Sequence, residues 1–266
     1  MFAEHDLEVE ILEPAPGPEN IRRVAAGGSD FCLTSVVHYL TARSQSGPLA
    51  ARFAAVVAQR SPMAGIVAAG SALNEPADLS GRRLGGPPDS RLVAEYQAGL
   101  RHLGLAPSVL VPTDYGEAPA ALGRGEIDVV ADFVDLVPRT RRQASIDVRA
   151  VPLPVEVYAS GLVAADGLPD EVVERMVAAV AAALEHQRRD PRAGLPELRR
   201  RYPQADPDEA LEGWALAEPN IFTGVAPGSM DPRRWEATTA FLTEAHGFPA
   251  VEPESLYRPE RKKVLS

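Results

Sequence analysis

Two short segments carry residue types that could do chemistry. Asp132 and Asp135 stand three positions apart, so they could act as paired carboxylates in acid–base chemistry or accept hydrogen bonds from an amino or ring N–H group. Alternatively, either carboxylate could cap the N-terminus of a helix and have no role in binding or chemistry. Phe133, between them, could stack on a planar molecule or pack inside the protein. The segment predicts contact with a small molecule, provided that the elements around it open onto a cleft.

Cys32 is the one thiol of the chain and could act as a nucleophile with His38 nearby. Its neighbours Phe31 and Leu33 are apolar, which favours a small buried residue on a strand instead. A single cysteine excludes an internal disulfide and a multi-cysteine zinc site. Because the five histidines show no metal-ligand spacing, we predict no metal and no cofactor.

The composition bounds the class of protein. The chain has 266 residues, of which 45% are hydrophobic and 24% charged, as in a globular protein of one large or two small domains. Its net charge is −10 and its pI is about 5.1, which argues against a nucleic-acid partner. No apolar run approaches the roughly 18 residues of a membrane span, and the first residues show no secretion signal.

Short apolar runs alternate with helical patterns through the middle of the chain, which predicts an α/β protein with mainly parallel sheets. A further alternating run at 7–12 predicts a half-buried strand, and the end of the chain is predicted to be helical. The expected strands cover 30–33, 83–84, 108–111, 127–131, 148–153 and 157–164, and the expected helices cover 18–26, 34–43, 90–103, 117–122, 136–143, 171–189 and 231–247.

One pattern occurs twice, as GGSDFCL at 27–33 and GEIDVVA at 125–131. In each copy a glycine ends a helix, an acidic residue follows three positions later, and an apolar strand begins. The repeat predicts two similar lobes, with Thr34-Ser35 and Asp132-Phe133 at equivalent places beyond the carboxyl ends of their strands, where α/β proteins bind ligands. Two crossing segments, near 73–79 and 154–160, would then form a hinge.

Four stretches in order carry a resemblance to a known family: FAEHDLEVEI, AAGGSDFCLTSV, VVAQRSPMAGIVA and DLSGRRLGG, followed by MDPRRWEATTAFLTEAHGF near the end. The series resembles the solute-binding proteins of ABC importers, in the branch that handles nitrate, alkanesulfonates, taurine and thiamine-pyrimidine precursors. The resemblance implies a two-lobed type II periplasmic-binding fold, with lobe one at 1–75 and 158–266 and lobe two at 76–157.

The resemblance also implies a function and a place. We expect a monomeric, non-catalytic protein that binds a small polar solute, with heteroaromatic compounds among the candidates, between its lobes. It would deliver this solute to ABC permease subunits. The alternative is a cytoplasmic enzyme on the same fold that acts on a pyrimidine-like or organosulfur substrate. Family members carry a signal and a leading strand and helix before the FAEHDLEVEI-like segment, so an extracytoplasmic place is expected by resemblance, and a cytoplasmic one if Met1 is the true start.

The predicted ligand chemistry depends on the turn Pro87-Pro88-Asp89. Relatives are similar in binding anions with backbone N–H groups at the helix start that follows this turn. Two prolines remove donors and Asp89 adds a negative charge, so we expect an amine or other donor-bearing ligand rather than a sulfonate or nitrate. The predicted ligand-binding residues are Thr34, Ser35, Asp89, Ser90, Asp132, Phe133, Ser160 and Gly161.

Overall fold

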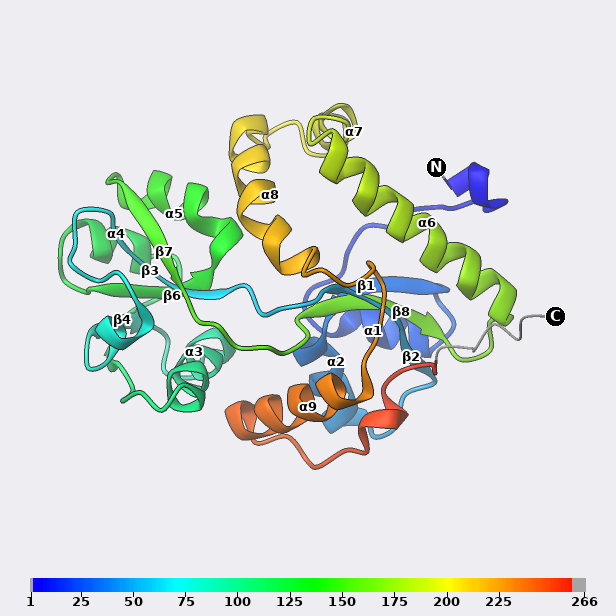
Figure 1. Cartoon of the computed structure of the whole chain (residues 1–266), viewed down its shortest axis with the longest axis horizontal. Helices are drawn as coiled ribbons and strands as arrows, with labels where there is room; N and C mark the ends of the chain where they lie inside the picture. The colour runs from blue at the N-terminus through cyan, green and yellow to red at the C-terminus, as the bar shows by residue number, and fades with distance from the viewer. Residues whose placement is uncertain (1, 260–266) are drawn as a thin grey trace.

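A computed structural model describes residues 2–259 and shows two α/β lobes joined side by side (Figure 1). Lobe one holds a three-stranded sheet and lobe two a five-stranded sheet, in the orders β1-β8-β2 and β5-β4-β6-β3-β7. The two-lobed α/β architecture predicted from the sequence is therefore confirmed. The strands are β1 (Phe31–Ser35), β2 (Ala51–Ala58), β3 (Met63–Ala68), β4 (Arg83–Gly86), β5 (Val109–Pro112), β6 (Val129–Phe133), β7 (Val148–Pro152) and β8 (Ser160–Ala165).

The strand directions differ from the prediction of mainly parallel sheets. In lobe one, β8 runs antiparallel to both β1 and β2. In lobe two, β4 is parallel to β5 and β6, whereas β3 is antiparallel to β6 and β7. The reason is that β3 and β8 each enter their lobe from the other lobe, so they run against their neighbouring strands, which end at the junction.

The lobe boundary also lies earlier than predicted. Because β3 pairs with β6 and β7, it belongs to lobe two, and the first crossing follows Ala58 instead of residue 75. The segment 73–79, predicted as a crossing, instead holds the 3₁₀ helix η2 (Pro76–Leu79) inside lobe two, with Leu79 fully buried. The second crossing, between β7 and β8, lies where the sequence predicted it.

Helices cover both sheets, and the C-terminal part is helical as predicted. Trp235 of α9 lies at the centre of the lobe-one core, stacked 5.4 Å from Tyr257 and tilted 5.0 Å from Phe53. Within the described residues, no helix combines the length and apolarity that crossing a membrane requires. The α-helices are α1 (Glu19–Ala25), α2 (Val36–Ser46), α3 (Arg91–His102), α4 (Ala118–Gly123), α5 (Val137–Ala144), α6 (Asp170–Arg189), α7 (Leu195–Arg201), α8 (Pro207–Ile221) and α9 (Pro232–His246); the short 3₁₀ helices are η1 (Phe2–His5), η3 (Val134–Leu136) and η4 (Pro253–Ser255).

The alternating segment 7–12 forms no strand, contrary to the sequence prediction. Leu7 and Val9 pack instead against a cluster of Ala55, Leu162 and Met176, which belong to β2, β8 and α6. Alternation predicts a strand only where a neighbouring strand supplies hydrogen-bond partners, and this segment gains its burial from side-chain packing alone.

The internal repeat is a structural repeat. Gly27 and Gly125 both have positive φ, +75° and +71°, and end α1 and α4. In each copy the next N–H bonds back five residues, from Gly28 to Arg23 O and from Glu126 to Ala121 O, which is the Schellman pattern. A strand follows each time, buried in β6 and only partly buried in β1, and both strands end at the junction of the lobes.

Candidate functional site

A cavity of about 920 Å³ opens between the two lobes. Its volume lies within the roughly 300–1,000 Å³ that small-molecule sites occupy. The register explains its position, because Ser35, Ala58 and Ser160 meet at one end of the lobe-one sheet, and Met63 pairs with Phe133 at the facing end of the other. The carboxyl ends of β1, β2 and β6 therefore point into the same space, as the repeat predicted.

Five of the eight predicted site residues line this cavity: Thr34, Ser35, Ser90, Phe133 and Ser160. Ser35 and Ser90 also cap helices, because their hydroxyls accept from His38 N at 3.2 Å and Val93 N at 3.4 Å. Both helix starts are thereby fixed at the cavity wall. Asp89, Asp132 and Gly161 lie outside the lining, each for a different physical reason.

Asp132 is held by protein groups. It is 5% exposed and accepts from Tyr115 Oη at 3.1 Å and from Phe133 N at 2.9 Å. Burial raises the pKa of its carboxyl, and these two hydrogen bonds oppose the rise. Tyr115 itself lines the cavity, so Asp132 acts on the site by orienting that phenol. Neither Asp132 nor Asp135 caps a helix: the N-caps of η3 and α5 are Phe133 and Leu136.

Asp135 is an acidic residue that lines the cavity from lobe two. Burial raises its pKa above the ordinary value, and its own backbone N–H partly offsets that effect. A desolvated carboxylate at a cavity wall is suited to accept hydrogen bonds from a donor-bearing ligand. The sequence singled out both Asp132 and Asp135. In the structure Asp132 is bonded to protein groups, and Asp135 lines the cavity.

Gly161 serves the sheet. An added Cβ would lie 2.3 Å from Ala55 O, at the place where β2 is bulged against β8. A close approach between strands therefore explains a glycine at this position, and its predicted ligand-binding role stays a prediction.

The start of α3 keeps hydrogen-bond donors that the sequence analysis expected the turn Pro87-Pro88-Asp89 to remove. Pro87 and Pro88 stand before the N-cap Ser90, so the first-turn N–H groups of Arg91 and Leu92 remain as donors. Asp89 is exposed and outside the lining, whereas Arg91 and Leu92 line the cavity. This wall therefore offers N–H donors, a helix N-terminus and a guanidinium, which suit a hydrogen-bond acceptor or an anion.

A histidine and a carboxylate complete the charged lining. Burial and the nearby Arg91 lower the pKa of His38, while Glu95 opposes that shift. Glu95 is paired with His246 of α9, at 3.2 Å from Oε1 to Nε2. Across the described residues, no group of three His, Cys, Asp or Glu side chains has the geometry to hold a metal ion.

Cys32 lies outside the cavity lining. Burial raises the pKa of its thiol to about 11, so almost none of it is thiolate near neutral pH. The interpretation as a small buried strand residue fits both observations better than the nucleophile does.

The sequence missed several lining residues, above all those of α8. Ala217, Asn220 and Ile221 reach the cavity from one side of that helix, and Tyr158 reaches it from the second crossing. Ala217, Asn220 and Ile221 are spaced three and four residues apart, which predicts that they share one face of the helix. Nothing in the sequence showed which element that face meets.

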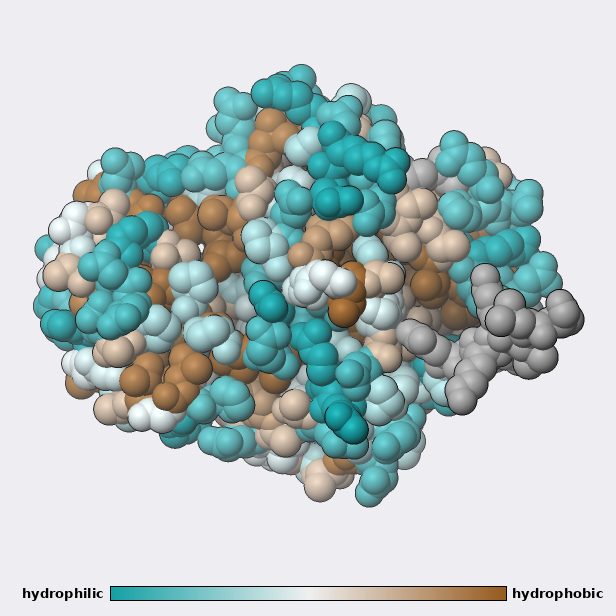
Figure 2. Space-filling view, viewed as in Figure 1, coloured by the Kyte–Doolittle hydropathy of each residue, from teal (hydrophilic) through white to brown (hydrophobic). Residues whose placement is uncertain are grey.

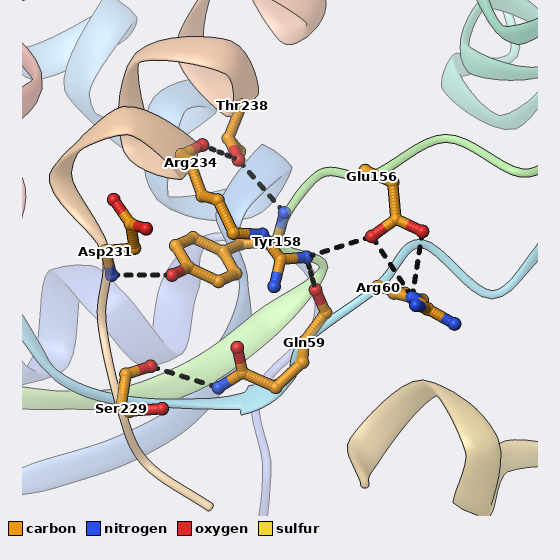
Figure 3. Close-up of polar contacts among 8 residues, drawn as sticks. All are labelled: Gln59, Arg60, Glu156, Tyr158, Ser229, Asp231, Arg234 and Thr238. Carbon is orange, nitrogen blue, oxygen red and sulfur yellow. Dashed lines mark hydrogen bonds and ion pairs between the residues drawn. The ribbon is translucent and has the colours of Figure 1, made fainter. Parts of the chain in front are cut away.

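Both crossings are tied to α9 by Arg234 (Figure 3). Its guanidinium donates to Gln59 O and lies 3.7 Å from Glu156, while Glu156 also pairs with Arg60 at 2.9 Å. The guanidinium also covers the ring of Tyr158 at 4.7 Å. This cluster joins the two hinge segments at the back of the cavity.

Comparison with known proteins identifies the family. A family model described as NMT1/THI5 like matches residues 1–193, well over half of the chain. The chain belongs to the NMT1/THI5-like family. A comparison with curated protein sequences gave no match.

Solved structures share the fold of this NMT1/THI5-like protein. The periplasmic aliphatic sulphonate binding protein SsuA from Escherichia coli matches with a TM-score of 0.67 at 16% identity, over 92% of this chain and 80% of that one. The alkanesulfonate-binding protein SsuA from Xanthomonas axonopodis pv. citri, bound to MOPS, gives 0.62 at 16% identity, over 91% and 85%. A cysteine-to-serine mutant of DSZB in complex with biphenyl-2-sulfinic acid gives 0.63 at 16% identity, over 97% and 91%.

Proposed function

We propose that this protein is a solute-binding protein that captures a small organic molecule in the cavity between its lobes for ABC-type import. The observation that carries the proposal is the cavity itself, built from both lobes and both crossing segments. A ligand that contacts both lobes favours the closed arrangement, which is how a two-lobed protein couples binding to shape. Family membership and the shared fold support the same function.

The ligand carries two kinds of polar group in this proposal. An acceptor or anionic group lies at the start of α3 with Arg91, and a hydrogen-bond donor faces Asp135. Phe133 and Tyr158 line the space as well, which suits a flat or apolar body between the polar ends. Sulfonates, which the turn Pro87-Pro88-Asp89 had argued against, are therefore candidate ligands again, and phosphates join them.

We propose a binding role over the enzyme alternative because of Cys32. The thiol is outside the lining and its raised pKa, about 11, removes the thiolate that a nucleophile needs. In this proposal the protein works as a monomer outside the cytoplasmic membrane, where it delivers the solute to ABC permease subunits.

Thermal-shift screening tests the proposal. The panel contains taurine, alkanesulfonates, nitrate, amino-pyrimidines and phosphorylated amino-pyrimidines. Compounds with both a donor and an anionic group should raise the melting temperature most, because both walls are then satisfied. A ligand present at 100 times its Kd stabilises by about 2.7 kcal/mol.

Ala159→Trp is the control, since Ala159 lines the cavity and an indole there takes up part of the space that a ligand needs. The shifts should vanish in this variant while its unliganded melting temperature stays close to that of the wild type. Shifts that persist in the blocked variant would place binding elsewhere, and a panel without any shift would count against solute binding of this kind.

A further inference from the structure

Helix α8 makes a third connection between the lobes, besides the two covalent crossings. Its C-terminal end is tied to the first crossing and to lobe one. Asn220 O accepts from Arg60 N at 3.0 Å in the crossing, and Gly228, in the segment after the helix, forms a β-bridge with Val56 of β2. Its N-terminal half lies against η3 and α5 of lobe two, and Figure 1 shows it standing between the lobes next to α5.

Two bidentate ion pairs hold α8 to α5, and we call these two pairs the latch. Arg141 donates to both carboxylate oxygens of Glu212, at 2.9 and 2.8 Å, and Arg142 donates to both of Glu209, at 2.6 and 3.1 Å. All four side chains are partly solvent-exposed. Dissolved salt therefore reaches the latch and can screen it.

A close backbone approach lies beside the latch. Gly213 contacts η3 so tightly that an added Cβ would be 2.9 Å from Asp135 O. Asp135 is the cavity carboxylate, so the position of α8 is mechanically coupled to the ligand site.

The next turn of α8 leaves a gap above lobe two. A second cavity of about 440 Å³ is lined by Pro219 of α8 and by Val134 of lobe two, while Leu216 of α8 packs against the apolar cluster that holds Val137 and Val148. Figure 2 shows apolar side chains exposed on this side of the molecule, between the regions of α5 and α8. The helix is thus held to lobe two at its ion pairs, at Gly213 and at Leu216, and the cavity leaves the apolar packing around Leu216 incomplete.

Pro219 lies inside α8, one residue before the anchor at Asn220. A proline in a helix removes the hydrogen bond to the carbonyl four residues earlier, which weakens the helix at that point. The latched part and the anchored part of α8 therefore meet at a place where bending is easy.

From these contacts we propose that α8 is a gate of the cavity: it pivots near Pro219, and the Arg141–Glu212 and Arg142–Glu209 pairs latch it shut against lobe two. Ala217 on its inner side moves with it, so opening uncovers one wall of the cavity. The gate regulates the site of the proposed function, yet it can be tested without any ligand.

Distance measurement between two spin labels tests the gate. One label is placed by Ala215→Cys on the exposed side of α8, and the other by Val109→Cys on β5, the edge strand farthest from β7 in the lobe-two sheet. Cys32→Ala removes the native thiol. We expect one short distance for the intact latch at about 50 mM NaCl, and a second, longer distance in the variant Glu209→Gln/Glu212→Gln.

Exposed ion pairs contribute about 0.2–1 kcal/mol each. Losing both should therefore raise the ratio of open to closed molecules about 2- to 30-fold. Raising NaCl to about 1 M in the unmodified latch should shift the ratio in the same direction, since salt screens exposed pairs. Gly213→Ala should do so without any change of charge.

Glu126→Gln is the matched control, because Glu126 also forms a bidentate pair, with Arg124, inside lobe two. It should leave the distance unchanged. An identical single distance in the latch variant, in Gly213→Ala and at high salt would overturn the gate, whatever the ligand screen shows. A lengthening in Glu126→Gln equal to that in the latch variant would also overturn it, because the effect would then not belong to α8.

Discussion

At the scale of single residues, the carboxylates of lobe two show how burial decides role. Asp132 and Asp135 are three residues apart, yet protein hydrogen bonds occupy one and the cavity receives the other. The sequence could place both at the end of a strand because the repeat marks that end. It could not say which faces the cavity, because Tyr115, the partner that draws Asp132 inward, comes from another loop.

Asp135→Asn should make the protein more stable at pH 7. The folded-state pKa of Asp135 is raised by burial, so its stability contribution is fully present below the unfolded value near 3.8 and is lost as pH rises through the folded value. An amide escapes that loss, so the gain should disappear below about pH 3.8. Melting temperatures across pH check this, with exposed Asp89→Asn as control; a stability loss at pH 7 would contradict the desolvation argument.

Cys32 should react slowly with alkylating agents. Its pKa rises from 9.0 to about 11, which reduces the thiolate about hundredfold at a given pH, and burial slows access further. The rate with iodoacetamide at pH 8 should therefore be at least about hundredfold below that of the urea-unfolded chain, and Cys32→Ala should leave ligand affinity within about threefold. Equal rates, or a turnover lost in Cys32→Ala, would restore the nucleophile.

At the scale of elements, local sequence signals located most helices and strands. Ser90 as a cap, Gly27 and Gly125 as helix ends, and Asp231-Pro232 as a helix start all act within a few residues, so the chain order reveals them. Strand partners are set by residues far along the chain. For this reason the segment of β3 was placed in lobe one, and the sheets were predicted to be mainly parallel.

Gly161→Ala should destabilise lobe one without touching the ligand site. Its Cβ would meet Ala55 O at 2.3 Å, and overpacking of this kind costs about 1–3 kcal/mol. Gly167→Ala is the matched control, because nothing lies within 4 Å of its added Cβ. Urea unfolding checks the difference between the two variants. Equal urea midpoints for the two variants would contradict this prediction, because β2 would then move away from the added Cβ at little cost.

At the scale of the whole molecule, three connections set the geometry of the cavity. The two crossings are gathered by Arg234 at the back, and α8 spans the lobes beside them (Figures 1 and 3). This arrangement gives a cavity with walls from both lobes and a helix that can move relative to one of them. The repeat predicted the facing strand ends, whereas the bridging helix depends on tertiary contacts alone.

Native mass spectrometry tests the central claim most directly. The protein is incubated with a small-molecule extract, desalted and measured beside Ala159→Trp, whose added indole takes up part of the cavity. We predict that the wild type carries one additional small mass per chain and that the blocked variant carries none. A wild-type protein that stays empty, or a bound mass that persists in Ala159→Trp, would contradict the assignment of this cavity as the solute site.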